Sequence, residues 1–507
     1  MGAVANLRKA PRAGSAANLR AEVERFLAAC HDPVLLEPGE APFELSRSAG
    51  WSCTSRGSFL LFEVWDENRS LARRVTALAE RCAARLTLAV ERFGGRTGTL
   101  ILADRARPES APALLRGSRT RLMEMLRRWL ARQFPHWQLR EISAGMDLEH
   151  SLSPACPRAL VTLGRKRCAA VAASEQHASH ALSQALLWAA HLRQRDGEDV
   201  HSVALFLPAG SESSAALRLR WLNVESRLFT WDQHGVEAPV DQADSGNRIQ
   251  DLAPWIDPPT AADGPAAQWV HELRLEEGVE AVPAAPGEWS LRIHGLEFAR
   301  YCGGELFYGI GERRRASSID PVRALARELA RWRSPDSPDP RHPWRLARPE
   351  AWLESVLRRR LDLIDPLLLP GPVYSQVAAV EGAGRGILDL VALRRDGRLT
   401  VIEIKATADL DLPLQALDYW VRVAHHAARG GFSPRGYFRG FAVDPRPPRL
   451  VLAAPALEFH PATETLLGFF RPEVEVERVG LGVEWHLRPR VVLRARGAAR
   501  PEWDDSP

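Results

Sequence analysis

The chain has 507 residues, too many for a single hydrophobic core, so we expect three or four structural units. Its apolar fraction of 45% and charged fraction of 26% are typical of an ordinary soluble globular protein. No run of residues approaches the roughly 20 apolar residues of a membrane span, and the N-terminus has no apolar signal core. We therefore expect a cytoplasmic protein without a membrane partner.

The net charge of +4 permits nucleic-acid binding without predicting it. The six cysteines form no CxxC pair and none lies beyond residue 302, which argues against structural zinc or an iron–sulfur cluster in the last third. No GxxxxGK[ST] loop occurs, so the chain has no P-loop motor of its own. Only three of the 67 basic residues are lysines (Lys9, Lys166 and Lys405), so a lysine here suggests a position that needs a compact ammonium.

The N-terminal part is expected to be β-rich. Residues 1–20 are small and basic and are expected to be disordered. Residues 21–115 are expected to form a small, mainly β domain, because short apolar runs such as Phe59–Asp66 and Thr97–Asp104 read as strands. The sequence assigns no function to this domain.

The middle part, residues 116–235, changes to a helical period. Apolar residues three and four apart over Arg121–Phe134 predict an amphipathic helix. Two strand-like runs, a helix over Ala181–Arg193 and a strand ending at Pro208 follow. Residues 236–345 begin with a stretch rich in proline and glycine, and we expect a linker followed by a small β segment.

Residues 346–500 are expected to form an α/β domain. A helix is predicted over Pro349–Ile364, and a second helix begins near Pro413. Between them lie three predicted strands, at Val373–Val380, Gly386–Leu393 and Leu399–Thr407. The last two strands are expected to form a hairpin, since the Asp-Gly pair at residues 396–397 is a strong turn signal between apolar runs.

The chemistry of this domain follows from the alternation along VIEIK. Val401, Glu403 and Lys405 face one side of the strand, while Ile402 and Ile404 face the other. Glu403 and Lys405 therefore project together, which an ordinary buried strand would avoid.

Asp389 lies on the paired strand, where a twisted hairpin can bring its carboxylate near that of Glu403. Two carboxylates with a few waters suit Mg²⁺, which prefers octahedral oxygen ligands. The ammonium of Lys405 could orient an attacking water and offset charge that builds on a phosphate.

These elements resemble the motifs of the PD-(D/E)xK nuclease superfamily, in which GxxD is followed by ExK on the next strand and QxxxY on the next helix. Here the motifs read Gly386-Ile-Leu-Asp389, Glu403-Ile-Lys405 and Gln415-Ala-Leu-Asp-Tyr419. The match covers roughly residues 349–460 and is closest to the branch that includes the nuclease domains of bacterial recombination helicase–nucleases. One departure is Leu388, which stands where the superfamily's name implies proline.

The resemblance implies a restriction-endonuclease-like fold for the C-terminal domain. It implies that Asp389 and Glu403 are ligands of Mg²⁺ or Mn²⁺ and that Lys405 is the catalytic lysine. It also implies that Gln415 and Tyr419 support the site or contact the DNA backbone.

The first core helix of the family often carries a further glutamate. Glu354 is the candidate for this role and for a third metal ligand, and whether Glu354 or Gln376 completes the site stays open. Some members of the branch use a histidine as an extra ligand, but His342, the nearest upstream histidine, lies in a stretch rich in proline and arginine.

The middle part repeats the element order of the C-terminal domain and is interpreted as a degenerate second copy. The interpretation aligns Gln184–Trp188 with Gln415–Tyr419 without gaps. On that register, residues that cannot bind metal in the family manner replace the catalytic ones: Arg158 for Asp389, Ala172 for Glu403 and Ser174 for Lys405. Such a copy would be catalytically inactive and could serve as a pseudo-dimer partner.

The leading interpretation is a metal-dependent deoxyribonuclease that hydrolyses phosphodiester bonds in DNA repair, recombination or defence, with a helicase or another repair protein as a potential partner. Two alternatives stay open: a non-catalytic DNA-binding scaffold that keeps the fold, and a ribonuclease. The run Arg358–Arg360 could contact phosphates, although such a run is more often a solvated helix face. The histidines at 177, 180, 425 and 426 have loose metal-like spacing but no partner acids or cysteines arranged around them.

Overall fold

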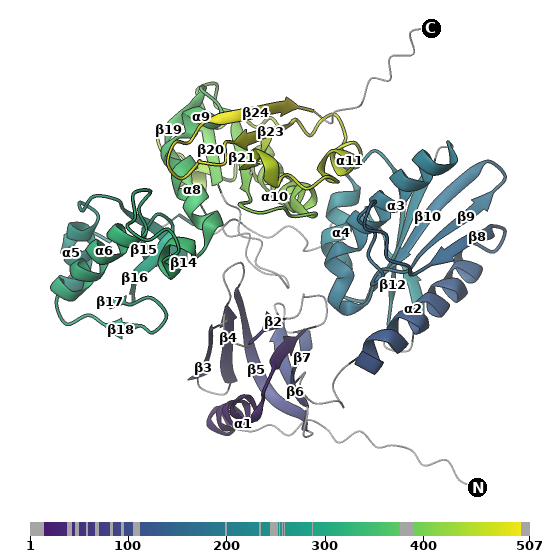
Figure 1. Ribbon diagram of the computed structural model, residues 1–507, viewed down its shortest axis with the longest axis horizontal. Helices are drawn as coiled ribbons and strands as arrows, with labels where there is room; N and C mark the ends of the chain where they lie inside the picture. Colours follow the sequence, from purple (N-terminus) through teal and green to yellow (C-terminus); the bar gives the residue numbers. More distant parts are fainter. Residues whose placement is uncertain are drawn as a thin grey trace. The chain divides into compact units, whose positions relative to one another are not determined.

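A computed structural model shows a mixed α/β protein that divides into two compact units. The first unit contains the sheets at residues 33–104 and 138–239, and the second contains those at 279–315 and 368–496 (Figure 1). The structure describes residues 15–37, 43–45, 50–56, 59–65, 70–81, 85–92, 96–104, 112–197, 200–232, 235–243, 252, 254–255, 257, 259–285, 287–375 and 390–497. Among these residues, no helix is both long enough and apolar enough to cross a membrane.

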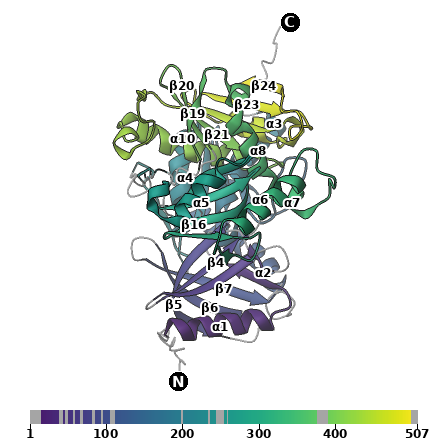
Figure 2. The same ribbon diagram turned by 90° about the vertical axis from the view of Figure 1, so that its left-hand side faces the viewer.

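The N-terminal sheet has seven strands in the order β2-β1-β7-β6-β5-β4-β3, and neighbouring strands are antiparallel. Its strands are β1 (Pro33–Leu36), β2 (Phe43–Glu44), β3 (Gly50–Arg56), β4 (Phe59–Trp65), β5 (Ser70–Arg81), β6 (Arg85–Arg92) and β7 (Arg96–Asp104). The helix α1 (Ala16–Ala29) packs against β3, β4 and β5 (Figure 2).

The start of α1 corrects the expectation that residues 1–20 are disordered, because the helix begins at Ala16. The Ser15 side chain caps it by accepting a hydrogen bond from the Asn18 backbone N–H at 3.3 Å. Apolar residues at helical spacing, among them Leu19, Val23 and Phe26, join the buried core of the sheet. Residues 1–14 lie outside the described residues.

The middle sheet has six strands in the order β13-β12-β11-β10-β9-β8. Its strands are β8 (Gln138–Ser143), β9 (Arg158–Leu163), β10 (Lys166–Ala172), β11 (Ser202–Pro208), β12 (Glu225–Trp231) and β13 (Glu237–Pro239). Its helices are α2 (Pro112–Gln133), α3 (Ala181–Asp196) and α4 (Glu212–Leu219), with a 3₁₀ turn, η3 (Glu175–His180), before α3. Residues of α2 share a core cluster with β9, β10, β11 and β12, whereas α3 packs on β10 and β11.

The C-terminal sheet also has six strands, in the order β19-β20-β21-β22-β23-β24. They are β19 (Leu368–Tyr374), β20 (Leu390–Arg394), β21 (Leu399–Ile404), β22 (Arg449–Pro455), β23 (Val476–Leu481) and β24 (Val491–Arg496). The flanking helices are α7 (Pro343–Leu346), α8 (Pro349–Arg359), α9 (Leu361–Ile364), α10 (Leu412–Ala428) and α11 (Thr463–Leu467), and the 3₁₀ turns are η6 (Ser433–Arg435) and η7 (Ala456–Glu458).

The middle and C-terminal sheets have the same topology. In each, the first three strands are antiparallel, the third and fourth and then the fourth and fifth are parallel, and the sixth is antiparallel to the fifth. In each, a long helix lies between the third and fourth strands and contacts both of them. The interpretation of the middle part as a second copy required the same strand order, and the structure meets that requirement.

Both faces of the C-terminal sheet are covered. Ile402 and Ile404 share a core cluster with residues of α8, including Leu353 and Leu357. The helix α10 contacts β21 and β22 but contributes no residue to that cluster, so it covers the opposite face. The hairpin expected at residues 396–397 is confirmed, because β20 and β21 pair antiparallel around it.

The predicted elements of the C-terminal domain differ in two places. The helix expected over Pro349–Ile364 breaks at Arg360, whose backbone (φ −130°, ψ 53°) is not helical, and continues as the short α9. The strand expected over Val373–Val380 begins earlier, at Leu368, and its second half falls among residues 376–389, outside the described part of the chain.

Part of the stretch expected to be a linker forms regular structure. The helix α5 (Pro265–Leu273) and the helix α6 (Asp320–Trp332) pack on a five-stranded antiparallel sheet. Its strands are β14 (Val279–Ala285), β15 (Glu288–Ile293), β16 (Leu296–Cys302), β17 (Glu305–Tyr308) and β18 (Arg314–Arg315), and the 3₁₀ turn η5 (Ala261–Asp263) precedes α5. The proline content of this stretch led to the wrong prediction of a linker. Pro265 occupies the first turn of α5, where no backbone N–H is needed.

Candidate active site

The candidate site lies where β21 ends and the chain turns toward α10. Glu403 is 3% exposed, and its Oε2 atom is inaccessible to solvent. Because Ile402 and Ile404 pack in the cluster with α8, the alternation of the strand directs Glu403 to the opposite face. The backbone N–H of Lys405 donates to the carbonyl of Ala453 at 3.0 Å, which ties the end of this strand to β22.

Two carboxylates lie near the Lys405 ammonium, and a third polar side chain contacts one of them. Its Nζ lies 3.4 Å from Oδ2 of Asp409 and 3.9 Å from Oε1 of Glu350. The Gln415 amide, on the first turn of α10, lies 3.5 Å from Oδ2 of Asp409 and forms a weak hydrogen bond with it. The site thus gathers side chains from β21, the following loop, α8 and α10.

Asp409 is set by a local turn. Its Oδ1 accepts a hydrogen bond from the Asp411 backbone N–H at 2.9 Å, two residues ahead of it in the chain. Aspartate commonly closes such turns before a helix. This turn presents the other carboxylate oxygen to Lys405 and Gln415.

Glu350 is the α8 carboxylate next to Lys405, and the sequence analysis missed it. Burial raises the pKa of Glu350; the charge of Lys405 lowers it, and that of Asp409 raises it further. Glu354, the sequence-based candidate, instead forms an ion pair with Arg358 on its own helix. Residues four apart share a helix face, so the pattern that named Glu354 equally permitted Glu350.

The other predicted residues take different places. Tyr419 is buried, at 7% exposure, one turn beyond Gln415 on α10. Asp389 and Gln376 lie outside the described residues. Leu390, the chain neighbour of Asp389, pairs with Ile402, the chain neighbour of Glu403.

The arginine run and the histidines are engaged in local contacts. Arg358, Arg359 and Arg360 form ion pairs with Glu354, Glu280 and Asp362, so the run is not a free basic face. The Nδ1 atom of His342 accepts the Trp344 backbone N–H at 3.2 Å at the start of α7. His425 lies 2.8 Å from the Arg429 guanidinium.

The middle sheet carries no corresponding carboxylate set. Its hairpin pairs Arg158 with Val171, whereas the C-terminal hairpin pairs Leu390 with Ile402. If Ala172 occupies the position of Glu403, Arg158 corresponds to Leu390.

The expected replacement of Asp389 by Arg158 is therefore shifted by one residue, and Pro157 takes that position. The shift comes from the lengths of the two hairpin turns. Two residues separate Leu163 from its paired residue Lys166, whereas three residues separate Arg394 from Arg398. A gapless alignment cannot register that difference.

The chemistry of the C-terminal donor set is that of oxygen ligands. Within the described residues, the carboxylates of this site do not form a group of three within ligand distance of one another. The buried Glu403 is chemically suited to be one ligand of a hard cation such as Mg²⁺, and the sequence motifs name Asp389 as the second.

No protein-family model, no curated protein and no solved structure matches this chain.

Proposed function

We propose that the chain is a metal-dependent nuclease that hydrolyses phosphodiester bonds in DNA, with its active site at the end of β21. The observation that carries the proposal is the buried Glu403 two residues before Lys405, with Glu350 and Asp409 near the ammonium and Gln415 bonded to Asp409. Two carboxylates thus lie within ion-pair distance of the ammonium, and the strand that Lys405 follows carries a third, buried one.

The proposal includes a restriction-endonuclease-like fold for the C-terminal domain and a degenerate second copy in the middle. The mixed sheet, with an antiparallel hairpin followed by parallel strands around a crossover helix, supports this fold. The shared strand order and directions of the two sheets support duplication. Because topology alone does not define activity, the site has to carry the functional argument.

Mg²⁺ or Mn²⁺ would be held by Glu403 and Asp389, and Glu350 replaces Glu354 as the carboxylate expected to support it from α8. The bound cation would polarise the phosphate and lower the pKa of a coordinated water. Acidic side chains and water are the ligands that such cations prefer.

The protein's own residues would perform positioning and charge compensation. Lys405 would orient the attacking water and offset the negative charge that develops on the phosphate. Asp409 and Glu350 lie within ion-pair distance of the ammonium, and Gln415 contacts Asp409. Gln415 is therefore a positioning residue, and Lys405 is the group expected to contact the substrate.

The middle domain is proposed to be non-catalytic, because no acidic residue occupies the positions of Asp389 and Glu403 on its hairpin. A role in binding DNA without cleaving it is the second function proposed for this domain. Roles in repair, recombination or defence, and a helicase as a partner, remain part of the proposal.

The test is cleavage of linear, circular and single-stranded DNA and of RNA of the same sequence by the full chain with Mg²⁺ or Mn²⁺. The variants are Asp389→Asn, Glu403→Gln and Lys405→Ala. Lys166→Ala and Glu328→Gln are matched controls, since both residues are exposed and lie outside the site.

We expect metal-dependent DNA cleavage that is lost in the three site variants and kept in both controls. Cleavage of circular DNA would define an endonuclease, and preferential cleavage of RNA would change the substrate class. DNA binding without cleavage, unchanged in the site variants, would overturn the enzymatic proposal in favour of a scaffold.

A further inference from the structure

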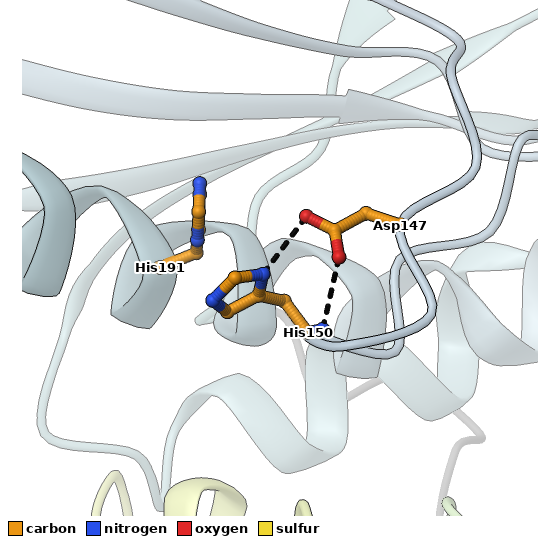
Figure 3. Close-up of side chains that lie close together, drawn as sticks. All are labelled: Asp147, His150 and His191. Atoms are coloured by element: carbon orange, nitrogen blue, oxygen red, sulfur yellow. Dashed lines mark hydrogen bonds and ion pairs between the residues drawn. The ribbon is translucent and has the colours of Figure 1, made fainter.

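A second cluster of metal-ligating side chains lies in the middle domain, where the sequence motifs indicate no metal. Asp147 and His150 come from the loop between β8 and β9, and His191 comes from α3 (Figure 3). Each side chain offers one ligand atom, and these three atoms lie within 4.8 Å of one another. Within the described residues, this is the one group of three or more such side chains with that spacing.

The loop is held in place before any ligand binds. The Gln184 side chain on α3 accepts the Ser153 backbone N–H at 2.7 Å and donates to the Ser151 carbonyl at 3.0 Å. Asp147 also accepts the His150 backbone N–H at 3.0 Å. These contacts place His150 against His191 without the participation of either imidazole.

The two imidazoles lie close together without a mutual hydrogen bond. Their ring centroids are 4.0 Å apart, at an interplanar angle of 61°. The Nδ1 atom of His191 is buried and has no hydrogen-bond partner in the described structure. Burial lowers the pKa of His191, and the nearby His150 lowers it further.

We propose that Asp147, His150 and His191 bind a divalent transition-metal ion, with Zn²⁺ as the expected occupant. Two imidazole nitrogens favour such an ion over Mg²⁺, which prefers an all-oxygen set. Three protein ligands leave a coordination position for water or another ligand, as in open zinc sites. On binding, the hydrogen bond of 2.8 Å between His150 Nδ1 and Asp147 Oδ2 is exchanged for bonds to the ion, and the imidazole proton moves through solvent to the ring nitrogen that does not bind the ion.

Two arginines, Arg158 and Arg195, act electrostatically on the cluster, and both lower the pKa of His191. The buried Arg158 guanidinium packs over the Trp188 ring, 5.3 Å from its centroid. The negative charge of Asp147 partly offsets the effect of burial, which lowers the pKa of Arg158. Arg195, the other nearby cation, is paired with Glu141 and Asp196. The single carboxylate and the two imidazoles therefore supply the direct ligands, and the arginines belong to the surroundings.

The metal site can be tested independently of the proposed nuclease, because none of its residues belongs to the C-terminal domain. Zn²⁺ binding would be measured by calorimetry on the full chain in the wild type and in the Glu403→Gln variant, which removes the proposed ligand of the other metal. His191→Ala and Asp147→Asn test the cluster. Asp147→Asn keeps an oxygen that can accept the His150 backbone N–H, and His201→Ala is the control because His201 is an exposed histidine of the same domain.

We expect one Zn²⁺ site in the wild type, in Glu403→Gln and in His201→Ala. Asp147→Asn and His191→Ala should weaken binding by more than about 100-fold, beyond the effect of losing an outer hydrogen-bond partner. Co²⁺ in place of Zn²⁺ should give a visible absorption band that the same two variants lose. The proposal is overturned if the wild type binds no Zn²⁺, or if well-folded Asp147→Asn binds it with unchanged affinity.

Discussion

Replacing Glu350 by glutamine distinguishes the two carboxylates of α8 that could support the proposed active site. Glu350 Oε1 lies 3.9 Å from Lys405 Nζ, and the two side chains are 31% and 18% exposed. At that separation two unit charges interact by about 1 kcal/mol in water and about 4 kcal/mol at an effective dielectric constant of 20. Solvent screens a partly exposed pair, so we expect a loss of about 1–2 kcal/mol.

This loss corresponds to a reduction of about 5–30-fold in the rate of metal-dependent DNA cleavage. The assay is single-turnover cleavage of a labelled duplex at saturating metal. Glu354→Gln is the matched control: Glu354 lies one helical turn away and pairs with Arg358, so its rate should stay within about twofold of the wild type. A larger loss in Glu354→Gln than in Glu350→Gln would refute the assignment.

The pH dependence adds a second readout for the same residue. Burial raises the pKa of Glu350, so the carboxyl takes up its proton at a higher pH than an ordinary glutamate. If the ionised form supports Lys405, activity should fall as pH decreases through that raised pKa, and Glu350→Gln should lack this part of the profile. The effect on stability has the opposite sign. Because the folded state favours the protonated Glu350, this residue contributes stability below its ordinary pKa, and that stability is lost as pH rises through the raised pKa.

Three further predictions concern the packing around the two sheets of the second unit. Burial raises the pKa of Glu297, but Arg300 and Arg313 outweigh burial and bring the pKa to about 2. The ionised Glu297 therefore stabilises the fold by about 3 kcal/mol above its ordinary pKa of 4.5, and this stabilisation is lost as pH falls toward 2. Glu297→Gln should reduce this acid sensitivity in circular-dichroism titrations of the full chain, and an unchanged profile would contradict the linkage. Glu477 is 3% exposed and accepts hydrogen bonds from Arg449 and Arg494 at 2.6 Å each, so Glu477→Ala should destabilise this unit by about 3–5 kcal/mol in urea unfolding, with the exposed Glu473→Ala near zero. Arg333 is fully buried and donates to the backbone carbonyls of Trp344, Ala347 and Arg348 before α8. Arg333→Met should therefore cost about 3 kcal/mol and speed hydrogen exchange at residues 343–348, whereas wild-type exchange there would show that the loop does not need this arginine.

Much of the C-terminal domain was predictable from local patterns. The Asp-Gly turn and the flanking apolar runs predicted the hairpin of β20 and β21, because both signals act within about ten residues of each other. Strand alternation likewise predicted that Glu403 and Lys405 project from the same face. The same local rules misread α5, since proline at a helix start and proline in a linker are alike in composition.

The partners of Lys405 required the packed structure. Asp409 lies only four residues away, but its turn toward the ammonium depends on where α10 begins. Glu350 and Glu354 are equivalent on a helical wheel, and only the way α8 lies on the sheet places the first near Lys405 and the second beside Arg358.

The sequence by itself determined which residues lie on the same side of each strand and helix, because backbone geometry repeats every two residues in a strand and about every 3.6 in a helix. Tertiary structure alone decided which of those faces meet. It brought Asp147 and His150 to His191 across about forty residues of chain, and it gave two sheets of slight sequence similarity one common topology. Such contacts depend on how whole elements pack, which no local period encodes.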